Sequence, residues 1–94
     1  MASVYILYSQ SLDKYYTGSC KDISERLEQH RQKKFSDAFT RIVSDWVLFY
    51  CINDLEYEQA RKIESHIKRM KSRKYITDLT KYPEITDKLI NLYK

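Results

Sequence analysis

The sequence is poor in the residues that break or redirect a chain, because only one of its 94 residues is glycine and only one is proline. Average usage would give about six glycines and five prolines at this length. We find no internal repeat and no low-complexity segment. A chain with a single glycine is expected to keep it where nothing else fits. Gly18 stands in Tyr16-Thr17-Gly18-Ser19, where a strand is expected to turn toward a helix.

Long apolar runs and paired cysteines are also missing. No run approaches the roughly 18 residues that a membrane span needs. The N-terminus has neither a basic segment nor a long apolar one, so we expect no signal peptide and a cytoplasmic protein. Cys20 and Cys51 are the only cysteines and lie too far apart in sequence to suggest a zinc knuckle or a redox pair. Without a secretory signal, a disulfide is not expected.

The composition that is present fits one small, mildly basic domain over residues 1–94. Hydrophobic residues make up 43% and aromatic residues 14%, which is too much packing material for a disordered chain. Seventeen basic residues against thirteen acidic ones leave a net charge of +4. Residues 83–94 are predicted to form a C-terminal helical extension.

The first eighteen residues predict a β-hairpin. Residues 3–9 are rich in β-branched and aromatic side chains, residues 10–13 are turn-like, and residues 14–18 form a second short strand. If the link has an even number of residues, Tyr5 and Tyr16 lie on the same face of the hairpin.

A helix and a third strand are predicted next. Asp22 followed by Glu25 resembles a capping box and opens a helix over residues 23–34. The apolar run within residues 42–52 does not alternate, which is typical of a strand buried on both faces. We therefore predict a third strand there, with a central place in the sheet.

The second half of the chain is predicted to be helical. Asn53 or Asp54 can cap a helix over residues 55–71, and Pro83 separates a short helix over residues 72–82 from a last one. The core stripe of the long helix contains Ala60, Ile63, Ile67 and Met70, with Glu64 beside it. The order β-β-α-β-α-α predicts an α/β fold with a small three-stranded, mainly antiparallel sheet flanked by helices.

Positive charge gathers in residues 61–74, which hold seven basic residues and one acidic residue, Glu64. Such blocks attract polyanions and displace condensed counterions from nucleic acid. Lys68, Arg69 and Lys71 are therefore predicted nucleic-acid contacts, with a merely solvated helix face as the alternative. The nine tyrosines add groups that can stack on bases or bind phosphate, although most are expected to be half-buried packing residues.

Four residues stand in an order and spacing that resemble a known nuclease family. Tyr5 is followed eleven residues later by Tyr16, which opens Tyr-Thr-Gly with Gly18; Arg26 comes ten residues further, and Glu64 lies in the later predicted helix. Over residues 3–76 this pattern resembles the GIY-YIG endonucleases, in particular their small stand-alone bacterial form. It is similar to the nuclease domains of the excinuclease C subunit and of homing endonucleases.

The pattern departs from the family at a few positions. Ser3 and Val4 replace the Gly-Ile of the first motif, and Thr17 replaces the isoleucine of the second. We expect none of these side chains to take part in chemistry. The late asparagine of several longer relatives has no clear counterpart, since Asn91 lies too far along the chain.

The resemblance implies metal-dependent hydrolysis of phosphodiester bonds in DNA, in a setting such as repair or recombination. Glu64 would hold Mg²⁺ or Mn²⁺, which commonly binds through one or two carboxylates plus phosphate oxygens and water. Arg26 would bind a phosphate oxygen, and Tyr5 or Tyr16 would take the proton from the attacking water. A phenol with an ordinary pKa of about 10 is a poor base at neutral pH, so Arg26, Lys14 or the metal would have to lower that pKa.

Three further residues are predicted to assist. His30 stands one helical turn from Arg26 and is a second candidate to orient the water or the phosphate. Gly18 and Ser19 could offer backbone N–H groups to phosphate ahead of the helix.

Each assignment has a structural alternative. Glu64 could be a surface acid paired with Arg61 or Lys68, Arg26 could pair with Asp22, and Tyr5 could be a core residue. The competing hypothesis for the whole chain is a nucleic-acid-binding module without catalysis. The residues leave open whether the DNA is branched or damaged, and whether a homodimer or a partner protein supplies targeting.

Overall fold

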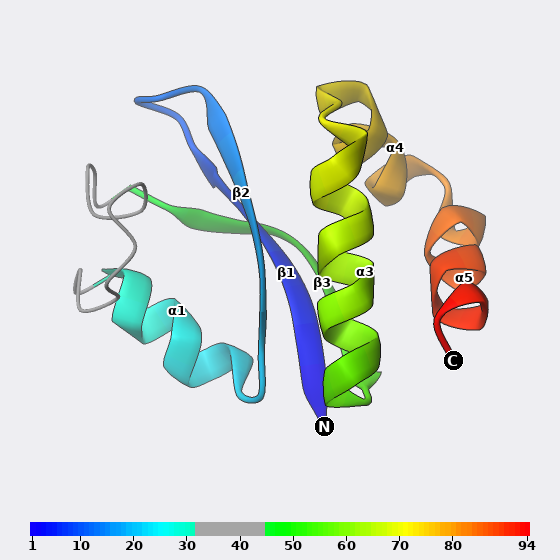
Figure 1. The fold of residues 1–94 in the computed structure, drawn as a ribbon. Helices are drawn as coiled ribbons and strands as arrows, with labels where there is room; N and C mark the ends of the chain where they lie inside the picture. The colour runs from blue at the N-terminus through cyan, green and yellow to red at the C-terminus, as the bar shows by residue number, and fades with distance from the viewer. Residues whose placement is uncertain (32–44) are drawn as a thin grey trace.

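A computed structural model describes residues 1–31 and 45–94 of the chain (Figure 1). The strands pair into one antiparallel sheet in the order β2-β1-β3. The elements are β1 (Ala2–Ser9), β2 (Lys14–Cys20), α1 (Ile23–Arg31), β3 (Val47–Leu55), α3 (Tyr57–Met70), α4 (Arg73–Lys81) and α5 (Pro83–Leu92). This confirms the predicted α/β class and the predicted order of the elements.

The hairpin has the predicted geometry. The link between β1 and β2 is four residues long, and the register pairs Tyr5 with Gly18 and Leu7 with Tyr16. Because side chains alternate along a strand, Tyr5 and Tyr16 project from the same face. Their ring centroids lie 6.4 Å apart.

The predicted central place of the third strand is wrong, because β1 lies in the middle and β3 is an edge strand. Residues 2–7 of β1 are all buried, so this is the strand covered on both faces. The apolar run of β3 begins instead with two exposed side chains, Val47 and Leu48. A run without alternation therefore misled the prediction of strand order.

Helices cover both faces of the sheet, as Figure 1 shows, with α1 on one side and α3 on the other. The α3 face holds a mainly aliphatic core that includes Val4, Ile6 and Ile63. The α1 face is built on Tyr5, Leu7 and Cys20, against which Tyr16, Ile23, Leu27 and Trp46 pack. Each face of β1 thus contributes to a different cluster of buried side chains.

The helix ends differ in part from the predictions. Asp22 caps α1 by accepting a hydrogen bond from the backbone N–H of Glu25, as the sequence indicates. The start of α3 is capped by Glu56 with Gln59 rather than by Asn53 or Asp54, because β3 continues to Leu55. The far end of predicted helix 23–34 lies outside the described residues.

The predicted core stripe of α3 is correct for three of its four members. Ala60, Ile63 and Ile67 are buried, whereas Met70 is 45% exposed. Met70 is the last residue of α3, and Lys71 directly after it has the left-handed backbone that ends the helix, so the chain turns away from the core there.

The last helix folds back against α3. The side-chain amide of Gln59 donates to the carbonyl of Ile90 over 3.0 Å, and His66 Nδ1 lies 2.9 Å from the Tyr93 hydroxyl. Leu89 is buried in the same core as Ile63. None of the helices in residues 1–31 and 45–94 has the length and apolarity that a membrane span requires.

Candidate active site

The predicted site residues converge on the open edge of β2. An edge strand has no neighbour on one side, so side chains from both faces of a sheet can meet around it. Glu64 reaches this edge from α3, and its Oε1 accepts a short hydrogen bond from the hydroxyl of Ser19 on β2. Its Oε2 lies 2.6 Å from Lys68 Nζ, and the same ammonium lies 5.7 Å from the centre of the Tyr16 ring. Lys68 thereby connects the carboxylate with the second motif tyrosine.

Gly18 is required by the packing of Tyr5 rather than by an unusual backbone. Its φ is not positive, so it is not needed for a left-handed turn. A Cβ at this position would lie 2.5 Å from the Tyr5 hydroxyl oxygen and 2.6 Å from its Cζ. The single glycine of the chain therefore leaves room for the Tyr5 phenol to cross β2.

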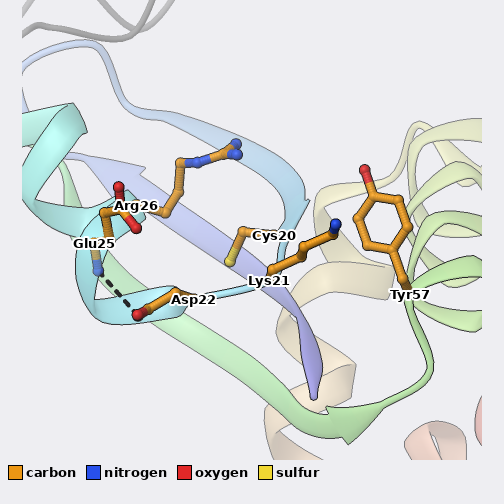
Figure 2. A pocket seen from close by; sticks show the side chains of 6 residues that line it. All are labelled: Cys20, Lys21, Asp22, Glu25, Arg26 and Tyr57. Carbon is orange, nitrogen blue, oxygen red and sulfur yellow. Dashed lines mark hydrogen bonds between the residues drawn. The ribbon is translucent and has the colours of Figure 1, made fainter.

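Arg26 joins the site from α1. Its Nη1 donates a long hydrogen bond of 3.4 Å to the Tyr5 hydroxyl. Arg26 also lines a polar cavity of about 230 Å³ between the start of α1 and the start of α3, shown in Figure 2. The other residues lining it are Cys20, Lys21, Asp22, Glu25 and Tyr57.

Burial controls the protonation of Tyr5. The residue is 1% exposed, and this desolvation raises the pKa of its phenol to about 12, although the hydrogen bond and charge of Arg26 act in the opposite direction. The negative charge of Glu64 adds to the increase in pKa. Arg26, one of the groups expected to lower the pKa of a motif tyrosine, acts in that direction on Tyr5, but burial outweighs it. Tyr5 is a neutral hydrogen-bonding group at pH 7.

The predicted nucleic-acid contacts separate into two groups. Lys71 lines a cavity of about 220 Å³ beside β2 that it shares with Lys14 and Lys68. Arg69 instead donates to the Tyr93 hydroxyl over 3.3 Å and lines a different cavity with Arg61, Lys62 and Ser65. Lys68 and Lys71 thus share the side of α3 that faces β2, whereas Arg69 faces α5.

Three other predictions have different outcomes. Gly18 and Ser19 lie inside β2, not in a turn ahead of the helix, and it is the Ser19 hydroxyl that reaches Glu64. His30 lies in α1, but its side chain is outside the described part of the chain. The alternative role of Glu64 as an acid paired with Lys68 is also observed.

The carboxylate of Glu64 suits a divalent cation. Within residues 1–31 and 45–94, no three histidine, cysteine, aspartate or glutamate side chains gather as a ligand cluster. Mg²⁺ needs only one or two carboxylates when phosphate and water complete its shell. Glu64 has 19% of its side chain exposed, is held by Ser19, and already has the ammonium of Lys68 on Oε2. A carboxylate oxygen is the donor type that Mg²⁺ and Mn²⁺ prefer, and an ion at Oε2 would displace the ammonium of Lys68.

Two contributions to the site were missed by the sequence reasoning. Trp46 packs edge-on against Tyr16 at a centroid distance of 6.3 Å, whereas the sequence places it only in the apolar run that predicts the third strand. The hydroxyl of Ser19 was overlooked in favour of its backbone N–H. No local pattern marks either contact, because each joins residues that are at least 30 positions apart.

Comparison with known proteins adds one match. The sequence model of the GIY-YIG catalytic domain matches residues 1–76, which contain all four motif residues and every strand of the sheet. No curated protein and no solved structure is found to match the chain.

Proposed function

This chain belongs to the GIY-YIG family of nucleases, and on that premise we propose that it is a divalent-metal-dependent endonuclease that hydrolyses phosphodiester bonds in DNA. The observation that carries the proposal is that Lys68 joins Glu64 to Tyr16 at the edge of β2, while Arg26 bonds to Tyr5, whose hydroxyl lies against Gly18 of the same strand. Phosphodiester hydrolysis needs charge neutralisation at the phosphate, a positioned water and a group that accepts its proton. Glu64, Tyr16 and Arg26 supply chemically suitable groups for each need.

Glu64 is the residue that would hold Mg²⁺ or Mn²⁺. A divalent ion there would act as a Lewis acid on the phosphate. The Ser19 hydroxyl orients the carboxylate through its hydrogen bond to Oε1. Lys68 adds positive charge beside Oε2, where an incoming phosphate would otherwise meet the negative charge of Glu64.

Arg26 is suited to bind a non-bridging phosphate oxygen. Its guanidinium carries a permanent charge and several donors in a fixed plane, which matches the geometry of phosphate. The side chain is half-buried and lines a polar cavity, so it lies where a phosphate can reach it. Its hydrogen bond to Tyr5 ties α1 to the strand that carries the first motif tyrosine.

We assign different tasks to the two motif tyrosines. Tyr5 is inaccessible to bulk water and has a pKa raised to about 12, so it acts as a neutral hydroxyl that accepts the hydrogen bond of Arg26 and positions that guanidinium. Tyr16 is only half-buried and is therefore more accessible to water than Tyr5. A general base has to lie within hydrogen-bond reach of the water that it activates, and on this ground Tyr16 is the proton acceptor in our proposal.

The proposed substrate is DNA that is recognised by its backbone. The cationic groups around β2 are lysine and arginine, which bind phosphates and fix the position of a nucleic acid without reading its sequence. Such recognition suits a nuclease that selects a DNA structure, for example a branch or a damaged site in repair or recombination.

Cleavage of supercoiled plasmid with Mg²⁺ or Mn²⁺ tests the proposal. Glu64→Gln keeps the shape of the side chain and removes its charge, and we expect it to lower the nicking rate by at least about 100-fold, since a catalytic metal contributes several kcal/mol to the transition state. Glu58→Gln, which changes an exposed acid in the first turn of α3, is the matched control and should nick at the wild-type rate.

Two outcomes would contradict the nuclease proposal. Equal nicking by wild type and Glu64→Gln would mean a contaminating activity or a different site. Salt-sensitive DNA binding without nicking under either metal would instead favour a nucleic-acid-binding module on the same scaffold.

A further inference from the structure

A second cluster of cations lies next to the site, around the ring of Tyr57. This residue begins α3 and is 43% exposed. Lys21 Nζ lies 5.2 Å from the ring centre and Arg61 Cζ lies 5.9 Å from it. Figure 2 shows the Lys21 side chain extended across the cavity mouth toward the Tyr57 ring. Both distances are within the range of a cation–π interaction, so the ring contacts two positive groups.

These two cations differ from the other basic groups near β2. Lys68 is paired with Glu64, and Arg73 is paired with Asp13. Within the described ranges, 1–31 and 45–94, neither Lys21 nor Arg61 forms an ion pair.

The cavity beside this cluster is suited to an anionic group. Its volume of about 230 Å³ would hold roughly eight waters at 30 Å³ each, enough for a hydrated phosphate. Two acids also line it. Asp22 is engaged in capping α1 through the Glu25 N–H, while the Glu25 side chain is exposed to water and so can turn away. The opposite wall is Arg26, which also bonds to Tyr5 in the site.

We infer that this cavity is a second phosphate subsite, in which Lys21 binds the backbone phosphate next to the one that Arg26 engages, while Arg61, which lines another cavity on α3, binds the phosphate after it. Tyr57 is the positioning residue, because its ring contacts both cations and lines the cavity beside Lys21. The inference rests on the proposed function and names the path of the substrate: the DNA backbone runs from the β2 edge past the start of α3. A polar wall favours phosphate over a stacked base as the occupant.

The salt dependence of DNA binding tests this assignment. Binding of a fluorescein-labelled DNA duplex is measured in the full chain carrying Glu64→Gln, so that cleavage does not interfere. The slope of log K against log salt concentration is negative, and each lost phosphate contact reduces its magnitude by about 0.9. We expect that decrease for Lys21→Ala and for Arg61→Ala, with affinity about 3- to 10-fold lower at low salt. Lys88→Ala, an exposed lysine on α5, is the matched control and should keep the slope.

Variants of Tyr57 separate positioning from simple structural support. Tyr57→Phe keeps the aromatic ring and should keep both slope and affinity, whereas Tyr57→Ala should lower the slope as Lys21→Ala does. Thermal unfolding of each variant checks that it is folded. An unchanged slope in Lys21→Ala and Arg61→Ala would overturn the inference. So would a loss of affinity in Tyr57→Ala at constant slope, because that pattern indicates base stacking.

The two proposals can fail separately. If plasmid is not nicked but the slope depends on Lys21 and Arg61, the nuclease proposal fails and the phosphate subsite stands. If nicking depends on Glu64 while the slope is unchanged in Lys21→Ala and Arg61→Ala, only the subsite inference fails. If both stand, Lys21→Ala should raise the KM for cleavage with little change in kcat, which is the effect of losing uniform substrate binding.

Discussion

The two faces of β1 are equally buried but serve different purposes. Toward α3 the strand presents Ala2, Val4 and Ile6, which pack into an aliphatic core. Toward α1 it presents Tyr5 and Leu7, and the Tyr5 hydroxyl takes part in the candidate site. Alternation along one strand thus separates the residues that stabilise the fold from those available for chemistry. We refer to them below as the α3 face and the α1 face.

The largest expected effect is a loss of stability on the α3 face. Ile63→Ala removes a fully buried side chain from α3, and such truncations cost about 2–5 kcal/mol of unfolding free energy. Urea denaturation measures the change. Ile23→Ala, at a half-buried position against the α1 face, should cost clearly less. Equal losses at the two positions would contradict the separation of roles.

The α1 face should respond to alkaline pH through Tyr5. A phenol whose pKa is raised in the folded state contributes stability that is complete below pH 10 and is lost as pH rises toward 12. At 1.36 kcal/mol per pKa unit, the loss is at most about 2.7 kcal/mol. Tyr5→Phe should not show this loss of stability when urea denaturation is compared between pH 10 and pH 12. Tyr82→Phe, which removes an exposed hydroxyl, is the control and should lose stability as wild type does.

Gly18 tests whether the α1 face controls catalysis. Gly18→Ala places a Cβ against the Tyr5 hydroxyl and pushes the phenol away from Arg26. Displacements of about 1 Å can cost up to about 100-fold in rate, and we expect plasmid nicking to fall by about 10- to 100-fold. Thr17→Ala changes the residue directly before Gly18, whose side chain lines the cavity on the α3 face. Nicking by this variant should fall much less. A similar fall in both variants would indicate general damage to β2.

The smallest effect concerns the contact that joins the two faces around β2. Lys68→Met removes the ammonium from Glu64 Oε2, and exposed ion pairs are worth about 0.2–1 kcal/mol. Mn²⁺ measured by calorimetric titration should therefore bind about 2- to 5-fold more tightly, because it no longer competes with a cation. Lys74→Met, which breaks the pair with Asp78 on α4, should leave Mn²⁺ affinity unchanged. Weaker Mn²⁺ binding in Lys68→Met would contradict this.

Local patterns in the sequence were sufficient for the elements and for part of the site. The β-branched and aromatic residues 3–9 predicted the strand, and the sequence indicated that an even link would put Tyr5 and Tyr16 on one face, because strand geometry repeats every two residues; the structure supplies that even link. The capping residue Asp22 and the apolar spacing of Ala60, Ile63 and Ile67 identified two helices for similar local reasons. The motif spacing led to the family that matches residues 1–76.

Only the tertiary structure decided which strand is central, what protonation Tyr5 has and which cations act together. The central strand depends on what covers each strand, and the pKa of Tyr5 depends on burial by segments far along the chain. Ser19 meets Glu64 across 45 positions, and Lys21 meets Tyr57 across 36. The periods of strands and helices cannot predict contacts between residues this far apart in the sequence. Strand and helix periods are set by the backbone within a few residues, whereas desolvation and contacts between elements exist only after those elements have packed.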